Sequence, residues 1–264
     1  HVLGMESTAR RVGDEYEITG GKVYVGNSHI ANLHCIVVRT GAPDDPRGLS
    51  AFLVESDRPG FSLAPHRPYM GLHGFSFGEL ILDRCRVPAS NMIGQEGDGL
   101  KLAYFSSVVY GRPNLTAVSL GILQALDELT THYVQHRKHK DKTLADLPTI
   151  KEKVALINSW KRTSEAIAYS AVACLDRRIP CDEDLMNAKF RTVEAALDAG
   201  RLAAEAHGAI ALKTDYPLER LIRDAFHPYA PAGTGDIQLL RLAQSALGLS
   251  KGQWSRLLWE DTSQ

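Results

Sequence analysis

The sequence predicts an α+β fold in which a small antiparallel β domain precedes a bundle of long helices. Two observations support this prediction. Up to about residue 96, apolar residues alternate with polar ones or form short β-rich runs, which is typical of strands. After that point apolar residues recur every three to four positions, which is typical of helices that bury one face. We therefore expect a β domain at residues 1–96, a helical domain at 97–250 and a C-terminal tail at 251–264.

The strands and helices can be placed within each domain. Turn-forming Gly, Pro, Asn and Asp residues separate the apolar runs of the β domain, which lie at residues 16–27, 33–41, 49–55 and 78–88. Long helices are expected at roughly residues 98–137, 147–177, 182–207 and 235–248. Pro148, Pro180 and Pro217 mark places where helices would begin, because proline is tolerated in the first helical turn.

Composition excludes several classes of protein. The 264 residues contain 30 basic and 31 acidic side chains, so the net charge of −1 gives no reason to expect nucleic acid as a partner. No apolar run approaches the roughly 20 residues needed to span a bilayer, so membrane insertion is not expected. The four cysteines lack metal-ligand spacing and are too few for a disulfide scaffold, which fits a reducing cytoplasm. The chain begins with His1 and not Met, so we expect a segment before it or a trimmed start.

A histidine cluster near the end of the first long helix is the most obvious candidate for a metal site. His132, His136 and His139 stand among four cationic residues, which are Arg137, Lys138, Lys140 and Lys142. Such a setting repels a divalent cation, so we expect no metal and interpret the cluster as solvated or anion-binding.

The segment HPYAPAGTGDIQ, residues 227–238, has the pattern of a turn that starts a helix. Gly233 and Gly235 permit a tight turn, and the first N–H groups of the following helix have no helical partner. These N–H groups and the Thr234 hydroxyl are suited to hold an anion or the edge of a cofactor. No carboxylate, histidine or thiol lies between Pro228 and Thr234, so the turn itself lacks a catalytic group.

Six ordered segments of the chain resemble the middle and C-terminal domains of the acyl-CoA dehydrogenase family. These segments are GDEYEITGGKVYVGNSHIAN, GFSLAPHRPYMGLHG, LDRCRVPASNMIGQEGDGLK, YGRPNLTAVSLGILQALDELTTHYVQHRKH, TDYPLERLIRDA and AGTGDIQ. The resemblance implies a barrel-like antiparallel β domain followed by a four-helix bundle. It also implies that the family's first helical domain, and most of its T-E-P-x-x-G-S-D loop, lie before His1.

The chemistry that the resemblance implies is α,β-dehydrogenation of an acyl thioester carried by CoA or by an acyl carrier protein, with FAD as cofactor. A base removes the α-proton while a hydride passes from the β-carbon to the flavin. Most of the family carries the base in the turn before the last helix, and here that position is Ala232. Other members carry it on the long helix just before an arginine, and here that position is Gly111. Both positions lack a carboxylate.

The resemblance also implies which residues line the cofactor and the substrate cleft. The cofactor residues would be Tyr24, Gly26, Asn27, Arg137, Gly208, Thr234, Asp236 and Gln238. The substrate cleft would be lined by Tyr110, Arg112, Ala232 and Gly233. The chain also departs from the family's motifs at Gly26, Lys140, Asp141, Glu205, Ala209 and Ala211.

Several of these residues have a structural alternative. Tyr24 either stacks on the flavin or packs on its own strand, and Thr234 either binds the cofactor or simply caps a helix. Arg112 is either a cleft residue or part of a buried ion pair. Arg137 either reaches a neighbouring subunit's FAD, as the resemblance implies, or ends a helix in solvent.

Three functions remain open from the sequence. The first is a dehydrogenase with a relocated base, for which the nearest candidates are Asp236, Glu205, Tyr229 and His227. The second is a flavin-dependent oxygenase or oxidase on the same scaffold. The third is a catalytically silent subunit that completes a partner's FAD site. Long helices with two apolar faces, and the neighbour that the family's FAD site requires, predict a homo- or hetero-oligomer.

Overall fold

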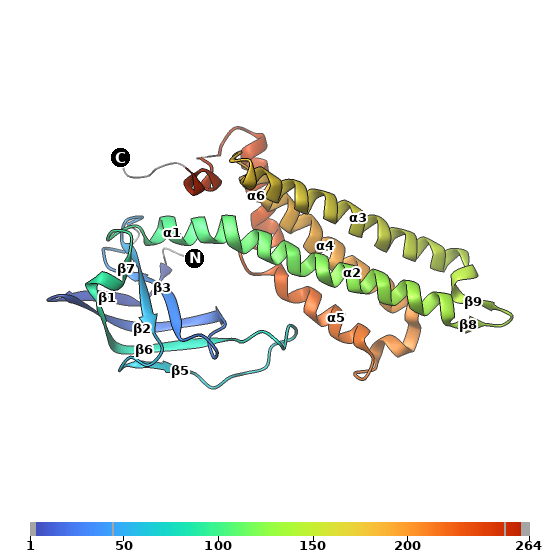
Figure 1. The fold of residues 1–264 in the computed structure, drawn as a ribbon, viewed down its shortest axis with the longest axis horizontal. Helices are drawn as coiled ribbons and strands as arrows, with labels where there is room; N and C mark the ends of the chain where they lie inside the picture. Colours follow the sequence, from blue (N-terminus) through green and yellow to red (C-terminus); the bar gives the residue numbers. More distant parts are fainter. Residues whose placement is uncertain (1–3, 44, 251, 260–264) are drawn as a thin grey trace. The chain divides into compact units, whose positions relative to one another are not determined.

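The computed structural model describes residues 4–43, 45–250 and 252–259 (Figure 1). The chain divides into two compact units. The β unit comprises the residues up to Tyr69 together with His73–Tyr104, and the helical unit comprises Met70–Leu72 and the residues from Phe105 onward. Across the described ranges, every helix is too short or too polar to cross a membrane.

A seven-stranded sheet forms the β unit. Its strands are β1 (Thr8–Val12), β2 (Glu15–Gly26), β3 (Leu33–Arg39), β4 (Leu49–Glu55), β5 (Phe61–Leu63), β6 (Phe77–Pro88) and β7 (Met92–Ile93), in the order β5-β6-β2-β1-β3-β4-β7. Neighbouring strands are antiparallel except for one parallel pairing, which joins Thr8 of β1 to Arg39 of β3. The four predicted strands correspond to β2, β3, β4 and β6. The sequence did not predict β1, β5 and β7, which have five, three and two residues. Strands this short show too little alternation of apolar and polar residues to be recognised.

Alternation along the strands builds the core of the β unit. Ile18, Ile36, Val38, Phe52 and Val54 are buried, and the residues between them face outward or are partly exposed. This burial of alternate side chains is what the sequence pattern predicts for a sheet with one covered face.

The helical unit consists of long helices joined by short turns. Its helices are α2 (Arg112–His136), α3 (Pro148–Asp176), α4 (Asp182–His207), α5 (Pro217–Phe226) and α6 (Gly235–Ala246). The helix α1 (Gly99–Ser106) runs through a π-helical turn, Ser107–Gly111, into α2. Three-residue and five-residue 3-10 helices follow at Leu144–Asp146, Gly208–Leu212, His227–Tyr229 and Trp254–Leu258, and a short hairpin is formed by β8 (Lys138–His139) and β9 (Lys142–Thr143). The expected long helix at 98–137 is confirmed apart from its π-helical turn, whereas α5 was missing from the predicted helices.

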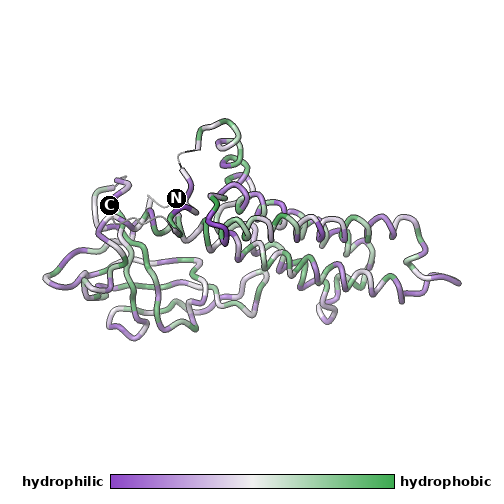
Figure 2. The backbone as a smooth tube through the Cα atoms, turned by 45° about the horizontal axis from the view of Figure 1, so that its top comes forward, coloured by the Kyte–Doolittle hydropathy of each residue, from purple (hydrophilic) through white to green (hydrophobic). Residues whose placement is uncertain are grey.

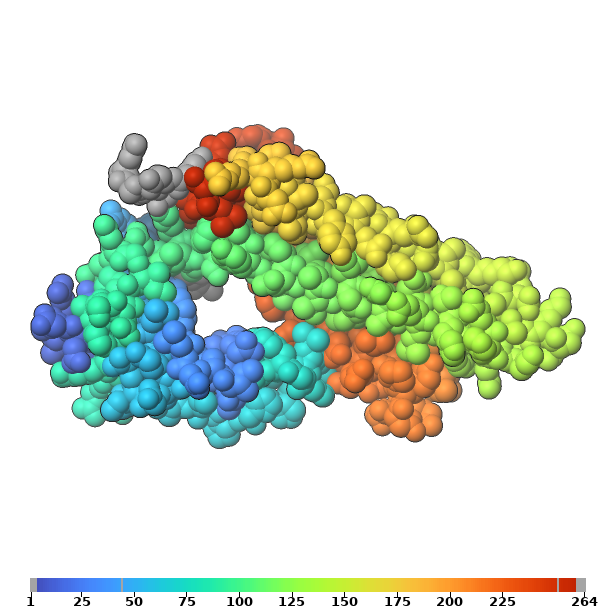
Figure 3. Space-filling view, in the orientation of Figure 1, coloured from blue at the N-terminus to red at the C-terminus, as the bar shows by residue number. Residues whose placement is uncertain are grey.

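Small side chains on α4 allow the bundle to pack closely. Ala196, Ala199 and Ala203 lie in one buried cluster with Leu123 of α2 and Ile157 of α3. Hydrophobic and hydrophilic stretches alternate along these helices in Figure 2, and the space-filling view shows α2 (green) in contact with α3 (yellow) and α5 (orange) without a gap (Figure 3). The turns at both ends of α2 are therefore carried on a rigid framework.

Candidate functional site

The two positions that lack a carboxylate meet in the structure. Gly111 is the last residue of the π-helical turn, and Ala232 lies in the turn that precedes α6. A Cβ atom built on Gly111 would stand 3.5 Å from the Cβ of Ala232, which is an ordinary van der Waals contact. Side chains at either position would therefore begin at the same place, although the positions are far apart in the sequence.

The backbone of this turn adopts an unusual conformation. Ala232 has a φ of 55° and Gly233 a φ of 98°, both in the left-handed region that disfavours residues with a Cβ. Gln238 of α6 is fully buried and its Nε2 donates to the carbonyl oxygens of Ala232 at 2.8 Å and Gly233 at 3.0 Å. Its Oε1 atom is buried without a hydrogen-bond partner among the described residues.

A buried lysine also binds this turn, and the sequence analysis missed it. Lys189 of α4 is 1% exposed, and its Nζ donates to the carbonyl oxygens of Tyr229 at 2.9 Å and Gly233 at 2.6 Å. A signal was present in the sequence, because Lys189 shares the helical spacing of buried Leu185 and Val193. A single lysine on an apolar face is readily taken for a surface residue.

Arg112 places a second cation in the same part of the helical unit. Its side chain is buried, and Nε and Nη1 have no hydrogen-bond partner within the described ranges. Burial lowers the pKa of Arg112 to about 10, although the negative charge of Asp182 acts to raise it. Burial, together with the charge of Arg112, lowers the pKa of Lys189 to about 8. Both groups remain cationic at neutral pH, so this region favours a negative charge.

The predicted buried ion pair of Arg112 is absent from the described part of the chain. Asp182 is the oppositely charged group that influences Arg112, but its two carboxylate oxygens accept the backbone N–H groups of Trp254 at 2.6 Å and Ser255 at 2.8 Å. Arg112 forms no ion pair in the residues that the structure describes. The guanidinium group therefore retains donors for another acceptor.

Thr234 takes the cap position of α6, as the structural alternative predicted. Its backbone is extended, with φ −66° and ψ 169°, and its carbonyl oxygen accepts the N–H of Gln238 at 3.0 Å. The hydroxyl group makes no capping hydrogen bond. Asp236 is exposed in the first turn of α6. The Thr234 hydroxyl and the first N–H groups of this helix are thus suited to bind an anionic or carbonyl edge.

The predicted cofactor residues of the β unit lie at the end of β2. Tyr24 is 66% exposed, with its ring 5.9 Å from that of Phe77 on the neighbouring strand β6, so packing on the sheet covers only part of its surface. Asn27 has a φ of 58° and donates its N–H to the carbonyl of Ser76 at 2.6 Å. A Cβ on Gly26 would stand 2.7 Å from Cζ of Phe75. The Phe75 ring therefore fills the space that a larger residue at position 26 would need.

Arg137 and Gly208 lie at the opposite end of α2 from Ala232. Arg137 is exposed directly after α2, and its N–H donates to the carbonyl of Tyr133 at 2.9 Å. The ring of Tyr133 stacks on His207, the last residue of α4, with centroids 4.2 Å apart, and Gly208 follows. With 25 residues, α2 is about 37 Å long. The predicted cofactor residues of the helical unit therefore form two separate groups.

The candidates for a relocated base are also separated by this geometry. Glu205 lies in the last turn of α4 and forms ion pairs with Lys153 and Arg201. It stands 16 residues after Lys189 on the same helix, or about 24 Å along its axis, so it cannot act beside Ala232. Asp236, His227 and Tyr229 remain close to Ala232 in the chain, and burial lowers the pKa of His227.

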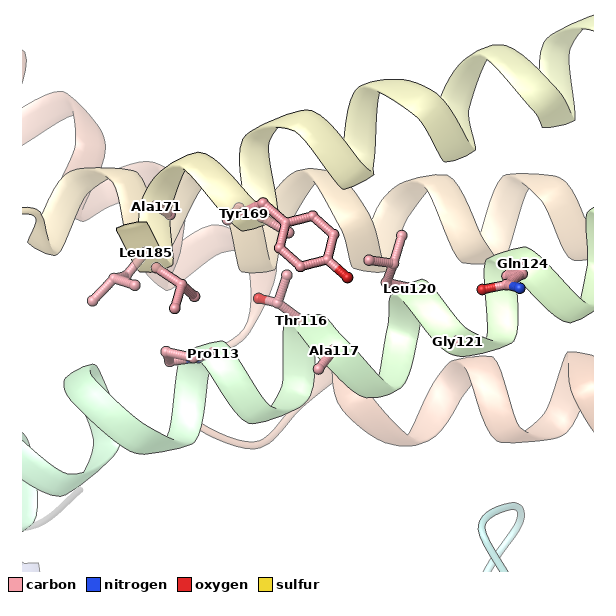
Figure 4. A pocket seen from close by; sticks show the side chains of 12 residues that line it. Pro113, Thr116, Ala117, Leu120, Gly121, Gln124, Tyr169, Ala171 and Leu185 are labelled. Atoms are coloured by element: carbon pink, nitrogen blue, oxygen red, sulfur yellow. The ribbon is translucent and has the colours of Figure 1, made fainter. Parts of the chain in front are cut away.

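A cavity of about 300 Å³ lies between α2, α3 and α4 (Figure 4). Figure 4 shows Tyr169 of α3 beside Thr116 and Leu120 of α2. Its twelve lining residues include no acid, lysine, arginine or histidine. Tyr110, predicted to line a substrate cleft, is 53% exposed in the π-helical turn and does not line this cavity. The cavity lining therefore carries no charged side chain, in contrast to the region around Ala232, where Arg112 and Lys189 are buried.

Comparisons with known proteins agree with the resemblance. Residues 1–85 match the family model "Acyl-CoA dehydrogenase, middle domain", and residues 97–247 match "Acyl-CoA dehydrogenase, C-terminal domain". The chain is 32% identical, over 245 residues, to an acyl-CoA dehydrogenase of Bacillus subtilis strain 168, covering 92% of this chain and 64% of that protein.

Two solved structures are similar over most of the chain. The prolyl acyl carrier protein oxidase AnaB has a TM-score of 0.87 and 28% identity, covering 92% of this chain and 64% of AnaB. The FAD complex of PigA has a TM-score of 0.87 and 25% identity, covering 94% of this chain and 64% of PigA. The chain thus spans slightly less than two thirds of the length of the proteins that it resembles.

Proposed function

Because this chain belongs to the acyl-CoA dehydrogenase family, we propose that the protein is an FAD-dependent oxidoreductase that acts on an acyl thioester. The observation that carries the proposal is the meeting of Gly111 and Ala232. The resemblance assigns the catalytic carboxylate to one or the other of these positions, and their Cβ sites lie 3.5 Å apart. A thioester α-carbon beside these sites would be within reach of a base at either position.

The residues present are compatible with FAD. The Thr234 hydroxyl is not used by its helix cap, and the first N–H groups of α6 have no helical partners. We propose that Thr234 and Asp236 bind the cofactor at the start of α6, where buried Gln238 holds the preceding turn. Within the β unit, we propose Tyr24, Gly26 and Asn27 as the cofactor residues. FAD supplies the acceptor for the hydride of the β-carbon.

The separation of the predicted cofactor residues supports an oligomer. A single FAD molecule is shorter than the roughly 37 Å between the two ends of α2, so it cannot contact both Thr234 and Arg137 of one chain. We propose that Arg137 and Gly208 contribute to the FAD site of a neighbouring copy or a related subunit. The domain boundary near residue 96 and a cytoplasmic location stay predictions.

The carrier of the thioester and the source of the base define the alternatives. AnaB is named an oxidase of a prolyl acyl carrier protein. Similarity to AnaB therefore supports a carrier protein as an alternative to CoA, and an oxidase as an alternative to a dehydrogenase. With alanine and glycine at both usual positions, proton removal in this chain requires another group, of which Asp236, His227 and Tyr229 lie nearest in sequence. The remaining alternative is a silent subunit.

The test is the reductive half-reaction of the full-length protein with its flavin bound, mixed with acyl-CoA or acyl carrier protein thioesters without oxygen. Bleaching of the flavin, together with an α,β-unsaturated product, supports the proposal. Reduction only by NAD(P)H or a reductase, followed by reaction of the reduced flavin with oxygen, favours an oxygenase. A flavoprotein that none of these donors reduces, or a protein without flavin, favours the silent subunit.

A further inference from the structure

We propose that Lys189 is a positioning residue, whose side chain fixes the 229–233 turn so that position 232 faces Gly111. The inference rests on the proposed function, because position 232 matters for catalysis only if an acyl thioester binds there. It begins from a buried lysine whose role neither the sequence pattern nor the family comparison assigns.

The contacts of Lys189 are unusual for a lysine. The side chain is 1% exposed, and a lysine at this depth normally has a carboxylate partner. Here Nζ donates to two backbone carbonyl oxygens, those of Tyr229 and Gly233. Glu194 influences its charge but forms no ion pair with it among the described residues. The ammonium group is therefore committed to the turn.

The positions of these two carbonyl oxygens explain how Lys189 holds the turn. Tyr229 begins the turn and Gly233 ends it, so Lys189 ties both ends to α4. Gln238 ties Ala232 and Gly233 to α6 in the same way. Two side chains from two helices thus hold three carbonyl oxygens of a turn that contains consecutive residues with positive φ.

A strained backbone persists only where its surroundings fix it. Without Lys189, the carbonyl of Tyr229 loses this donor, and Gly233 keeps only Gln238. The start of the turn is then free to relax, and the Cβ of Ala232 loses its placement beside Gly111. The bundle itself does not depend on this contact, because its main apolar cluster is formed by other residues of α2, α3 and α4.

The test compares Lys189→Met with Lys161→Met in the full-length protein. Methionine has nearly the length of lysine but no donor. Lys161 is a matched control, since it is also a largely buried lysine of the bundle, but its Nζ pairs with Asp127 at 2.6 Å. Amide hydrogen exchange is measured in peptides that cover residues 227–240. We expect Lys189→Met to raise the exchange rate there at least tenfold, and Lys161→Met to leave it within twofold of the parent.

Function is measured in an Ala232→Glu background, which places a carboxylate on the turn. We expect Lys189→Met to lower the rate of flavin reduction at saturating thioester about tenfold or more, with little change in the half-saturating concentration. Lys161→Met is expected to leave both values unchanged. If Lys189→Met does not fold, Lys189→Gln replaces it, because glutamine is one bond shorter and cannot reach both carbonyl oxygens.

Unchanged exchange in residues 227–240 of the Lys189 variant would overturn the proposal. Faster exchange with an unchanged rate of flavin reduction would show that Lys189 stabilises the turn without positioning residue 232, and this outcome also overturns it. If the Ala232→Glu protein shows no flavin reduction at all, the proposed function fails, while the exchange measurement still decides whether Lys189 fixes the turn.

Discussion

Replacing Gly233 with alanine is expected to destabilise the helical unit. Gly233 has a φ of 98°, which residues with a Cβ rarely adopt. Its added Cβ would stand 2.9 Å from Nε2 of Gln238 and 3.2 Å from Cγ2 of Ile237. The substitution therefore imposes backbone strain and displaces the amide group that holds the carbonyl oxygens of Ala232 and Gly233.

The magnitude follows from these two effects. A residue held in a sparsely populated backbone region costs about 1–3 kcal/mol. Each of the two Gln238 hydrogen bonds contributes about 1 kcal/mol. Alanine also lowers the conformational entropy of the unfolded chain relative to glycine, which stabilises the folded state by about 0.4–1 kcal/mol. The expected net loss in the free energy of unfolding is therefore about 2–5 kcal/mol.

Tryptophan fluorescence during urea unfolding measures this loss in the helical unit, because Trp160, Trp254 and Trp259 all lie there. The matched control is Gly235→Ala, at the first residue of α6, where the added Cβ would meet the Phe190 ring at an ordinary 3.5 Å. We expect this control to be neutral or slightly stabilising. Loss of less than about 0.5 kcal/mol in Gly233→Ala, or equal losses in both variants, would refute the assignment of strain to this turn.

Three further predictions test other parts of the structure. Gly71→Ala should release the segment Met70–Leu72 from α5, because the added Cβ would stand 2.4 Å from the carbonyl oxygen of Arg223. Gly74→Ala is the control, since its Cβ would have nothing within 4 Å. The exchange rate of the Leu72 amide, which donates to Asp224 at 2.6 Å, should rise only in Gly71→Ala. Burial lowers the pKa of His207 in the folded protein. The free energy of unfolding should therefore be highest above the unfolded-state pKa of about 6.5, and should fall as the pH drops through 6.5 toward the lower folded pKa. Urea unfolding at a series of pH values should show a smaller fall in His207→Phe. Leu123→Ala should cost about 2.7–5 kcal/mol in the same fluorescence assay, because Leu123 is fully buried in the bundle, and a loss under 1 kcal/mol would contradict this packing.

The sequence predicts the elements with strong periodicity, but it does not predict the contacts that shape the site. The change of hydrophobic period near residue 96 separates strands from helices, and the glycines at 233 and 235 mark the turn and the start of α6. The short helix α5 escaped prediction because ten residues contain fewer than three helical turns. Pro217 did mark its first residue.

The contacts that shape the site join residues far apart in the chain, so the sequence pattern did not predict them. Nothing local indicates that Lys189 reaches two carbonyl oxygens 40 and 44 residues later in the chain. Likewise, the position of Glu205 near the cofactor motif suggested a relocated base, but the length of α4 places it far from Ala232. The meeting of Gly111 and Ala232 depends on the packing of the π-helical turn against the loop before α6, which periodicity does not encode.

The most direct test of the proposed acyl thioester site is the rate of flavin reduction in Ala232→Glu and Ala232→Gln, compared with the parent, on anaerobic mixing with acyl-CoA and acyl carrier protein thioesters. Glutamate supplies a base at the point where positions 111 and 232 meet, and glutamine has the same shape without a basic group. General-base catalysis typically contributes roughly 10²–10⁴-fold, so we expect at least a tenfold gain in the glutamate variant, or about 1.4 kcal/mol, and none in the glutamine variant. The assay extends above neutral pH, because burial raises a carboxyl pKa. A glutamate variant that binds flavin and thioester as well as the parent, yet gains nothing at any pH, would contradict an acyl thioester site at Ala232.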